Sequence, residues 1–190
     1  MKTRESSISL LAATPSRAHE DALRRFGRER SGLRIVFLPG DPSRALLKLI
    51  EAVDLFMPRA AVCLGESRSG AAGAWTMSAA ARNGAPGGDP VDPSGPEALD
   101  ATLPAALWAE AARRRGGAAV AGALPSDGEL GALAYGLIRY VSLRGTETWF
   151  GRRPPAGLSC RAGCAEGVPD AGSGLAAVLE AAEEAAASAP

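Results

Sequence analysis

The chain has 190 residues and a formal net charge of zero, with 21 basic and 21 acidic side chains. This length favours one domain, and a hydrophobic fraction of 46% is too high for a disordered chain. We therefore expect a single domain over residues 1–190. The balanced charge lacks the basic excess with which proteins bind a phosphate backbone, so nucleic acid is excluded as an expected partner.

Segments that would direct the chain to a membrane or hold a metal are missing from the sequence. No apolar run approaches the roughly 18–20 residues of a bilayer span, and the first nine residues lack a hydrophobic signal core. The three cysteines are too few for a disulfide framework, and the one histidine, His19, lies far from Cys160 and Cys164. We expect a cytoplasmic protein without a membrane partner, a metal or another cofactor.

Apolar strands and amphipathic helices alternate in the first half of the chain. The pattern predicts strands at 8–13, 33–38 and 60–64, and helices at 15–27 and between Pro42 and Pro58. Asp41 or Ser43 can cap the second helix. The third strand is uniformly apolar, which is typical of a strand buried on both faces. This β-α-β-α-β order predicts an α/β protein.

The second half is less regular but continues the same alternation. The pattern predicts helices at 103–115, 130–141 and 175–187, strands at 118–122 and 146–150, a long loop at 84–96, and an irregular Gly- and Pro-rich segment at 151–173. We expect a three-layer α/β/α sandwich around a central, largely parallel (mixed) sheet. The expected core comprises Ile35, Phe37, Val62, Leu64 and Val120 on strands, covered by Leu46, Ile50, Val53, Leu133 and Leu137 on helices.

Four segments together carry a resemblance to a known family. They are Cys63-Leu64-Gly65 at the end of a strand, the run from Pro90 to Pro104 with its Pro-x-Asp, Gly-Pro and Thr-Leu-Pro elements, Ala134–Tyr140, and Trp149–Pro154. In this order and spacing they resemble the pyroglutamyl peptidase I (peptidase C15) family over nearly the whole chain. The resemblance implies the fold of that family and a cysteine peptidase triad, in which a Glu orients a His that activates the thiol.

At the positions that the resemblance assigns to the triad, this chain carries other residues. Leu130 stands in the place of the nucleophile and has no nucleophilic atom. Arg152 stands in the place of the His and stays protonated, so it cannot act as a base at neutral pH. The place of the Glu falls on Thr76, or with a slip of one or two residues on Met77 or Ser78. We therefore expect no catalytic residue.

The expected substrate pocket is altered as well. The family has a Gly- and Phe-containing loop after its first strand, whereas this chain passes from Ala13 directly into Thr14-Pro15-Ser16. Glu66 replaces a Gln that follows the Gly-Leu-Gly of the family. The remnant pocket that the resemblance implies is made up of Gly65, Glu66, Thr76, Glu129, Leu130 and Arg152.

The sequence therefore predicts a pyroglutamyl peptidase I-like protein without catalysis, with a role in binding or assembly. The alternative is a hydrolase, of the cysteine or another type, that removes N-terminal pyroglutamate-like groups with a relocated active site. Glu129 or Glu66 would be its base. The sequence also leaves open a homo-oligomer, in which the partner is a second copy of the chain.

A small acidic ligand is the other expected partner. Arg152 and Arg153, with Arg68, supply fixed positive charge and forked donors that suit a carboxylate or phosphate. Solvation of these arginines, or pairing with Glu147 or Glu166, is the alternative.

Three further groups receive structural interpretations. Cys63 is expected to be a small buried hydrophobe rather than a nucleophile. Cys160 and Cys164 are expected to be incidental thiols, with a regulatory disulfide as the alternative. The glutamates at 180, 183 and 184, like His19, are expected to lie on solvated helix faces.

Overall fold

The fold is a three-layer sandwich in a computed structural model that describes residues 8–17, 20–67, 73–84, 88–122, 129–144, 155–162 and 171–188. The strands are β1 (Leu10–Thr14), β2 (Leu33–Phe37), β3 (Ala60–Ser67), β4 (Trp75–Ser78), β5 (Ala80–Arg82), β6 (Ala98–Asp100), β7 (Ala119–Gly122) and β8 (Ala156–Ala162). The helices are α1 (Glu20–Glu29), α2 (Pro42–Phe56), α3 (Ala105–Arg114), α4 (Glu129–Leu143) and α5 (Ala171–Ala187).

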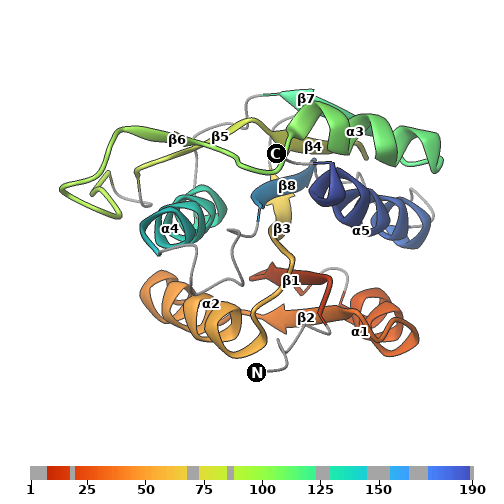
Figure 1. The fold of residues 1–190 in the computed structure, drawn as a ribbon, viewed down its shortest axis with the longest axis horizontal. Coiled ribbons are helices and arrows are strands. Elements are labelled where there is room, and N and C mark those ends of the chain that lie inside the picture. Colours follow the sequence, from red (N-terminus) through yellow and green to blue (C-terminus); the bar gives the residue numbers. More distant parts are fainter. Residues whose placement is uncertain are drawn as a thin grey trace, which may run out of the picture.

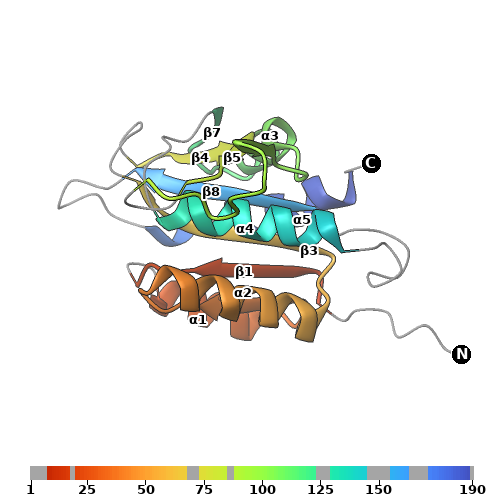
Figure 2. The same ribbon diagram turned by 90° about the vertical axis from the view of Figure 1, so that its left-hand side faces the viewer.

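A six-stranded sheet in the order β2-β1-β3-β8-β4-β7 forms the middle layer. The first four strands of this order are parallel, β4 pairs antiparallel with β8, and β7 runs parallel to β4. Helices α1, α3 and α5 cover one face, and α2 and α4 cover the other (Figure 1; Figure 2). The predicted α/β sandwich with a mixed, largely parallel sheet is confirmed.

Several predicted elements have nearly the predicted bounds. These are the strands at 33–38, 60–64 and 118–122 and the helices at 103–115 and 130–141. The predicted cap of α2 is also present, because the backbone N–H of Arg44 donates to Oδ1 of Asp41 at 2.8 Å.

Other predictions were wrong or fall outside the described residues. Strand β8 lies inside 151–173, which we predicted to be irregular, and the short strands β4, β5 and β6 were missed. Helix α1 begins at Glu20 rather than at residue 15, and α5 begins at Ala171 rather than at 175. The predicted strand at 146–150 lies outside the described residues. Position in the sheet, rather than local sequence, makes β8 a strand, because it pairs with β3 and β4 on both sides.

Core burial follows distance from the sheet edges. Val62 and Leu64 of the central strand β3 are buried, as are Val53, Leu133 and Leu137 on the covering helices. Ile35 and Phe37 are half-buried because β2 is an edge strand, and Leu46 and Ile50 of α2 are half-buried too. Val120 is 45% exposed, which contradicts our prediction, because β7 forms the other edge of the sheet.

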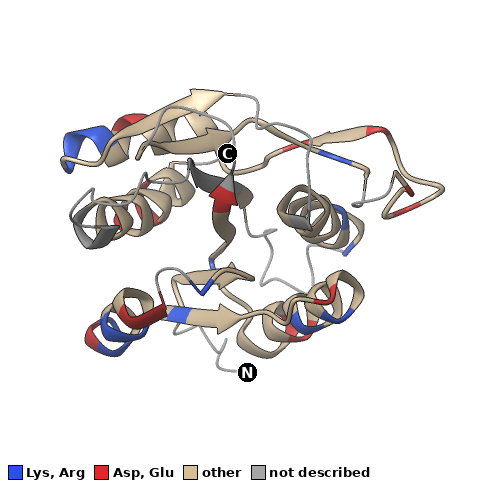
Figure 3. Ribbon diagram, turned by 180° about the vertical axis from the view of Figure 1, so that it is seen from behind, with Lys and Arg blue, Asp and Glu red and all other residues tan. Residues whose placement is uncertain are grey.

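Helix α5 contacts its neighbours through ion pairs as well as through its apolar face. Glu180 accepts from Arg30 at 3.0 Å, and Glu184 pairs with Arg115 at 2.5 Å and with Arg114. The Ser9 hydroxyl donates to Glu183 at 2.5 Å. The predicted acidic face is therefore not only solvated, since its glutamates pair with arginines of the turn after α1 and the end of α3. Acidic and basic positions of α1, α3 and α5 lie on one side of the ribbon in Figure 3.

Among the described residues, no helix combines the length and apolar character that a membrane span requires.

Candidate functional site

Gly65 and Thr76 lie in one row across the sheet. Gly65 of β3 is the register partner of Cys160 in β8, and Cys160 is in turn the partner of Thr76 in β4. Two strand spacings, about 10 Å, therefore separate Gly65 from Thr76. Only the backbone of Cys160 is described.

Both ends of this row point to the face of the sheet that α2 and α4 cover. Cys63, two residues before Gly65 on the same strand, belongs to the core cluster shared with α2 and α4. Trp75 and Met77, the neighbours of Thr76, belong to the opposite cluster with α3 and α5, so Thr76 points toward the α4 side. Thr76 is half-buried, and its methyl group would touch a Cβ added at Gly122, at 3.7 Å.

Leu130, in the first turn of α4, lies directly on Gly65. A Cβ added to Gly65 would lie 2.6 Å from Cδ2 of Leu130, a distance that real Cβ atoms do not show. Glycine at 65 thus permits α4 to approach the sheet. Of the six predicted pocket residues, Leu130 contacts Gly65, and Thr76 lies on the same face of the sheet two strands away.

The other three pocket candidates are Glu66, Glu129 and Arg152. Glu66 is exposed at the end of β3. Glu129 opens α4, but its side chain is not described, and Arg152 lies outside the described residues, as do Arg153, Arg68, Glu147, Glu166, Cys164 and His19. Their predicted roles remain predictions.

Leucine, threonine and glycine supply no nucleophile–base pair at this place. A hydroxyl such as that of Thr76 needs an adjacent base to attack a carbonyl. Within the residues that the structure describes, no group of three or more His, Cys, Asp or Glu side chains could hold a metal ion.

Cys63 lies two residues before Gly65 but is too deeply buried to act as a nucleophile. Its side chain has no exposed surface, and burial raises the pKa of its thiol to about 12. At neutral pH the thiol is therefore protonated and inaccessible. The prediction of a structural cysteine is confirmed.

A polar cluster that the sequence analysis missed holds the loop before β6 against α4. Asp92 accepts from Nε of Arg139 at 2.8 Å and from the Ser94 hydroxyl at 2.7 Å. The Asn83 amide donates to the backbone oxygen of Asp92 at 2.7 Å, and the backbone N–H of Asp92 donates back to the Asn83 side chain at 2.9 Å. The pKa of Asp92 is lowered to about 2, first by the hydrogen bond from the Ser94 hydroxyl and then by the hydrogen bond from Arg139. The Pro-x-Asp motif contained this residue, but two of its partners, Asn83 and Arg139, are 9 and 47 positions away.

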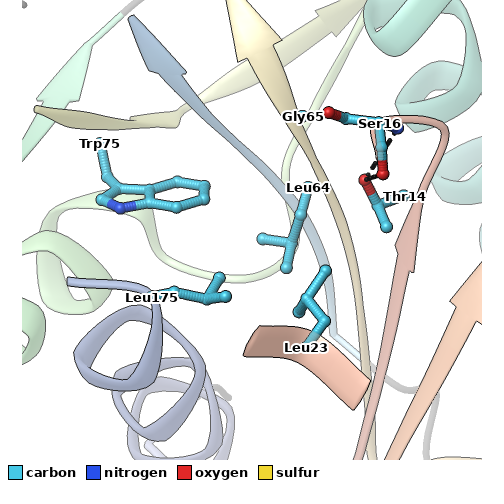
Figure 4. Close-up of a pocket in the computed structure, with 7 residues that line it drawn as sticks. All are labelled: Thr14, Ser16, Leu23, Leu64, Gly65, Trp75 and Leu175. Atoms are coloured by element: carbon cyan, nitrogen blue, oxygen red, sulfur yellow. Dashed lines mark hydrogen bonds between the residues drawn. The ribbon is translucent and has the colours of Figure 1, made fainter. Parts of the chain in front are cut away.

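The cavity shown in Figure 4 lies at the carboxyl ends of β1 and β3, on the face of α1 and α5. It is lined by Thr14, Ser16, Leu23, Leu64, Gly65, Trp75 and Leu175. Its interior has room for about one water molecule. Thr14 shapes the rim, because its hydroxyl accepts from the backbone N–H of Ser16 at 3.1 Å and so turns the chain directly after β1.

Comparison with known proteins identifies the fold. No model of a known protein family matches the sequence, and no curated protein matches it significantly. Among solved structures, pyroglutamyl peptidase I from Bacillus amyloliquefaciens is similar, with a TM-score of 0.69, 21% identity, and 95% of this chain and 93% of that chain covered. The chain has the pyroglutamyl peptidase I fold.

Two archaeal structures with this fold agree. Pyrrolidone carboxyl peptidase from Thermococcus litoralis has a TM-score of 0.68 at 16% identity, covering 95% of this chain and 92% of that one. A mutant pyrrolidone carboxyl peptidase from Pyrococcus furiosus has a TM-score of 0.71 at 17% identity, covering 95% and 98%. The structural similarity thus extends over nearly the full length of these proteins. At such low sequence identity it establishes the fold but not the activity.

Proposed function

We propose that this protein is a non-catalytic protein built on the pyroglutamyl peptidase I fold, with a role in binding or assembly. The observation that carries the proposal is the contact between Leu130 and Gly65. An apolar side chain occupies the start of α4, where the sequence resemblance places the nucleophile. A cytoplasmic location belongs to this proposal as an expectation from the sequence.

The residues around Gly65 and Thr76 support the same proposal. Leu130 packs against the core cluster of α2 and α4. Thr76 replaces the acid that would orient a base, and burial keeps the nearby Cys63 thiol protonated. Nucleophile, base and orienting acid act as a unit, so that losing one of them removes most of the acceleration.

Incubation with a pyroglutamyl-linked fluorophore, beside an active pyroglutamyl peptidase, tests the proposal. We expect turnover to be lower than that of the active enzyme by more than about 100-fold, since the residual acceleration of a site without its triad comes from binding alone. A Leu130→Cys variant is the matched control. It should remain inactive, because a thiol without a base and an orienting acid is not activated.

Turnover within about 100-fold of the active enzyme would contradict the proposal and favour a relocated active site. Glu66→Gln and Glu129→Gln variants would then identify the base, because the amide cannot accept the proton. Cys63→Ala would test the buried thiol in the same assay.

The acidic ligand expected at Arg152 remains part of the proposed binding role. A thermal-shift screen of small carboxylates and phosphates checks it, because a ligand that binds the native state raises the melting temperature. Stabilisation of the wild type but not of Arg152→Ala supports the ligand. Equal stabilisation of both proteins, or of neither, excludes it.

A further inference from the structure

Strand β2 leaves one side of the six-stranded sheet open. It is the first strand in the order β2-β1-β3-β8-β4-β7, and no described strand pairs with its outer side. Figure 1 shows β2 at this edge of the sheet, with α2 on one face and α1 on the other. The open edge of a sheet presents backbone N–H and C=O groups to which another extended chain can bind.

The pairing of β2 with β1 shows which backbone groups lie along the open edge. In a parallel pair, residues that bond to the partner strand alternate with residues that point away from it. The C=O of Gly32 accepts from β1 at 3.2 Å, and the N–H of Leu38 donates to β1 at 2.8 Å, so the even-numbered residues bond to β1. Ile35 therefore directs both its N–H and its C=O to the open edge, together with the C=O of Leu33 and the N–H of Phe37.

Contacts at the two ends of β2 agree with this assignment. The N–H of Leu33 donates to the backbone oxygen of Arg30 at 3.1 Å, and Nζ of Lys48 donates to the backbone oxygen of Phe37 at 2.8 Å. Neither partner is part of the sheet. The outward groups between these two contacts are the ones that a short added strand would bond.

Positive charge lies on the α2 side of this edge. Arg34 of β2 is exposed, and its guanidinium carbon lies 4.7 Å from the centre of the Phe56 ring in α2. The contact of Lys48 with Phe37 holds a second cation beside the edge. Within the described residues, neither Arg34 nor Lys48 forms a salt bridge. An acidic side chain on this side would therefore be attracted.

The α1 side of the edge is apolar, and its charges are partly paired. Ile35 and Phe37 are half-buried and pack against the core cluster on this side. Arg17 and Arg24 lie over the Phe37 ring, 5.1 and 4.7 Å from its centre, and Glu20 pairs with both arginines. An apolar side chain beside Ile35 therefore fits this side.

The charges at the edge decide between two kinds of added strand. Pairing of β2 with β2 of a second copy would bring two Arg34 and two Lys48 side chains together, and like charges across paired strands are destabilising. Charged side chains on edge strands commonly prevent such self-pairing. The same charges favour a segment that carries carboxylates.

We propose that the open edge of β2 binds a short extended segment of a partner protein as an added strand, with acidic side chains on the α2 side and apolar side chains on the α1 side. This inference rests on the proposed binding role and names the class of partner, at a surface apart from Leu130. The strand is short and its charges are exposed, so we expect weak binding, with a Kd of about 0.1–1 mM.

Two blocked pentapeptides are matched probes because they differ only in charge. One has the sequence Glu-Val-Glu-Val-Glu, and the other has Lys-Val-Lys-Val-Lys. We expect the acidic peptide to shift the backbone amide NMR signals of Ile35 and Phe37 saturably in the full-length protein. The basic peptide should bind at least about fivefold more weakly, since Arg34 and Lys48 repel it.

Amide hydrogen exchange tests the backbone pairing with a control inside the same strand. The N–H groups of Ile35 and Phe37 point to the open edge, whereas those of Arg34 and Val36 point to β1. The acidic peptide at ten times its Kd should slow exchange at Ile35 and Phe37 by about tenfold and leave Arg34 and Val36 unchanged. Equal slowing at all four amides, or at none, would overturn the inference.

Charge reversal at Arg34 tests the specificity. Arg34→Glu should weaken the acidic peptide at least about fivefold and strengthen the basic one. Arg82→Glu is the matched control, because Arg82 is an exposed strand residue in the separate two-stranded sheet, and it should leave both affinities unchanged. The amide spectrum of each variant shows that it is folded. Equal affinity for both peptides in the wild type, or an unchanged preference in Arg34→Glu, would contradict the proposal.

Sedimentation of the wild type tests the second copy as an occupant. A dimer in which Ile35 and Phe37 are protected before any peptide is added would assign the edge to self-pairing and overturn the inference. A protein whose edge amides become protected only with the acidic peptide supports it.

This proposal and the proposed function fail separately. Hydrolysis of the fluorogenic substrate together with saturable shifts at Ile35 and Phe37 would overturn the loss of catalysis and leave β2 as a binding edge. An inactive protein with unchanged Ile35 and Phe37 signals would overturn the binding edge and leave the loss of catalysis in place.

Discussion

The hydroxyl of Tyr140 donates to the carboxylate of Asp54, with its oxygen 2.7 Å from Oδ1 and 2.6 Å from Oδ2, and so joins α4 to α2. Arg144 pairs with the same carboxylate at 3.1 Å. This contact lies at the far end of α4 from Leu130. It joins the helix that carries Leu130 to α2.

Replacement of Tyr140 by Phe should destabilise the protein by about 1–2 kcal/mol, because the carboxylate of Asp54 loses a charge-assisted hydrogen bond. The pKa of Tyr140 is raised to about 12, first by burial and then by Asp54. A raised pKa in the folded state stabilises the protein below the ordinary tyrosine pKa of about 10, and this contribution is lost as pH rises toward 12. Urea denaturation at pH 8 and pH 11 should show the difference between wild type and variant shrinking at high pH. A constant difference would contradict the assignment.

Gly65→Ala should destabilise the protein by roughly 1–3 kcal/mol, because the new methyl group overlaps Leu130. Leu130→Ala in the same chain should recover part of this loss, which gives a favourable coupling of about 0.5–3 kcal/mol in a double-mutant cycle. Gly40→Ala is the matched control, since a Cβ there meets nothing within 4 Å. Additive effects of the two substitutions would show that the predicted contact is absent.

Asp92→Asn should loosen the loop before β6 and lower the stability of the protein at neutral pH. Because the pKa of Asp92 is lowered to about 2, its stabilising effect is present above the ordinary carboxyl pKa of about 4 and is lost as pH falls toward 2. The stability difference between wild type and variant, measured by chemical denaturation, should therefore decrease between pH 5 and pH 2.5. The exposed Asp89→Asn removes a carboxylate outside this hydrogen-bonded cluster and is the matched control.

Cys63 should react with a thiol reagent such as DTNB only when the protein unfolds. In a variant with Cys160 and Cys164 changed to Ser, the native protein should release less than about 5% of the colour seen in urea, because a buried protonated thiol is a poor nucleophile. Fast labelling under native conditions would show that β3 opens to solvent. Cys63→Ser should cost about 1–3 kcal/mol by burying a hydroxyl in an apolar strand.

Local sequence predicts the elements whose residues carry their own signal. The apolar run of β3, the periodic helices α2 and α4, and the Asp41 cap depend on residues within a few positions of one another, so the sequence alone indicates them. The fold class follows from their alternation. The absence of a catalytic residue, which the sequence predicts from the residue types of Leu130 and Thr76, stays a prediction.

Only the tertiary structure decided which of these residues meet, because their contacts join segments far apart in the chain. Strand β8 has a Gly- and Cys-containing sequence without alternation and is a strand because β3 and β4 flank it. Val120 has the sequence of a core residue but lies on an edge strand, where half of the pairing surface is open. The contact of Leu130 with Gly65 and the cavity between β1 and β3 depend on packing across the sheet, which no local pattern encodes.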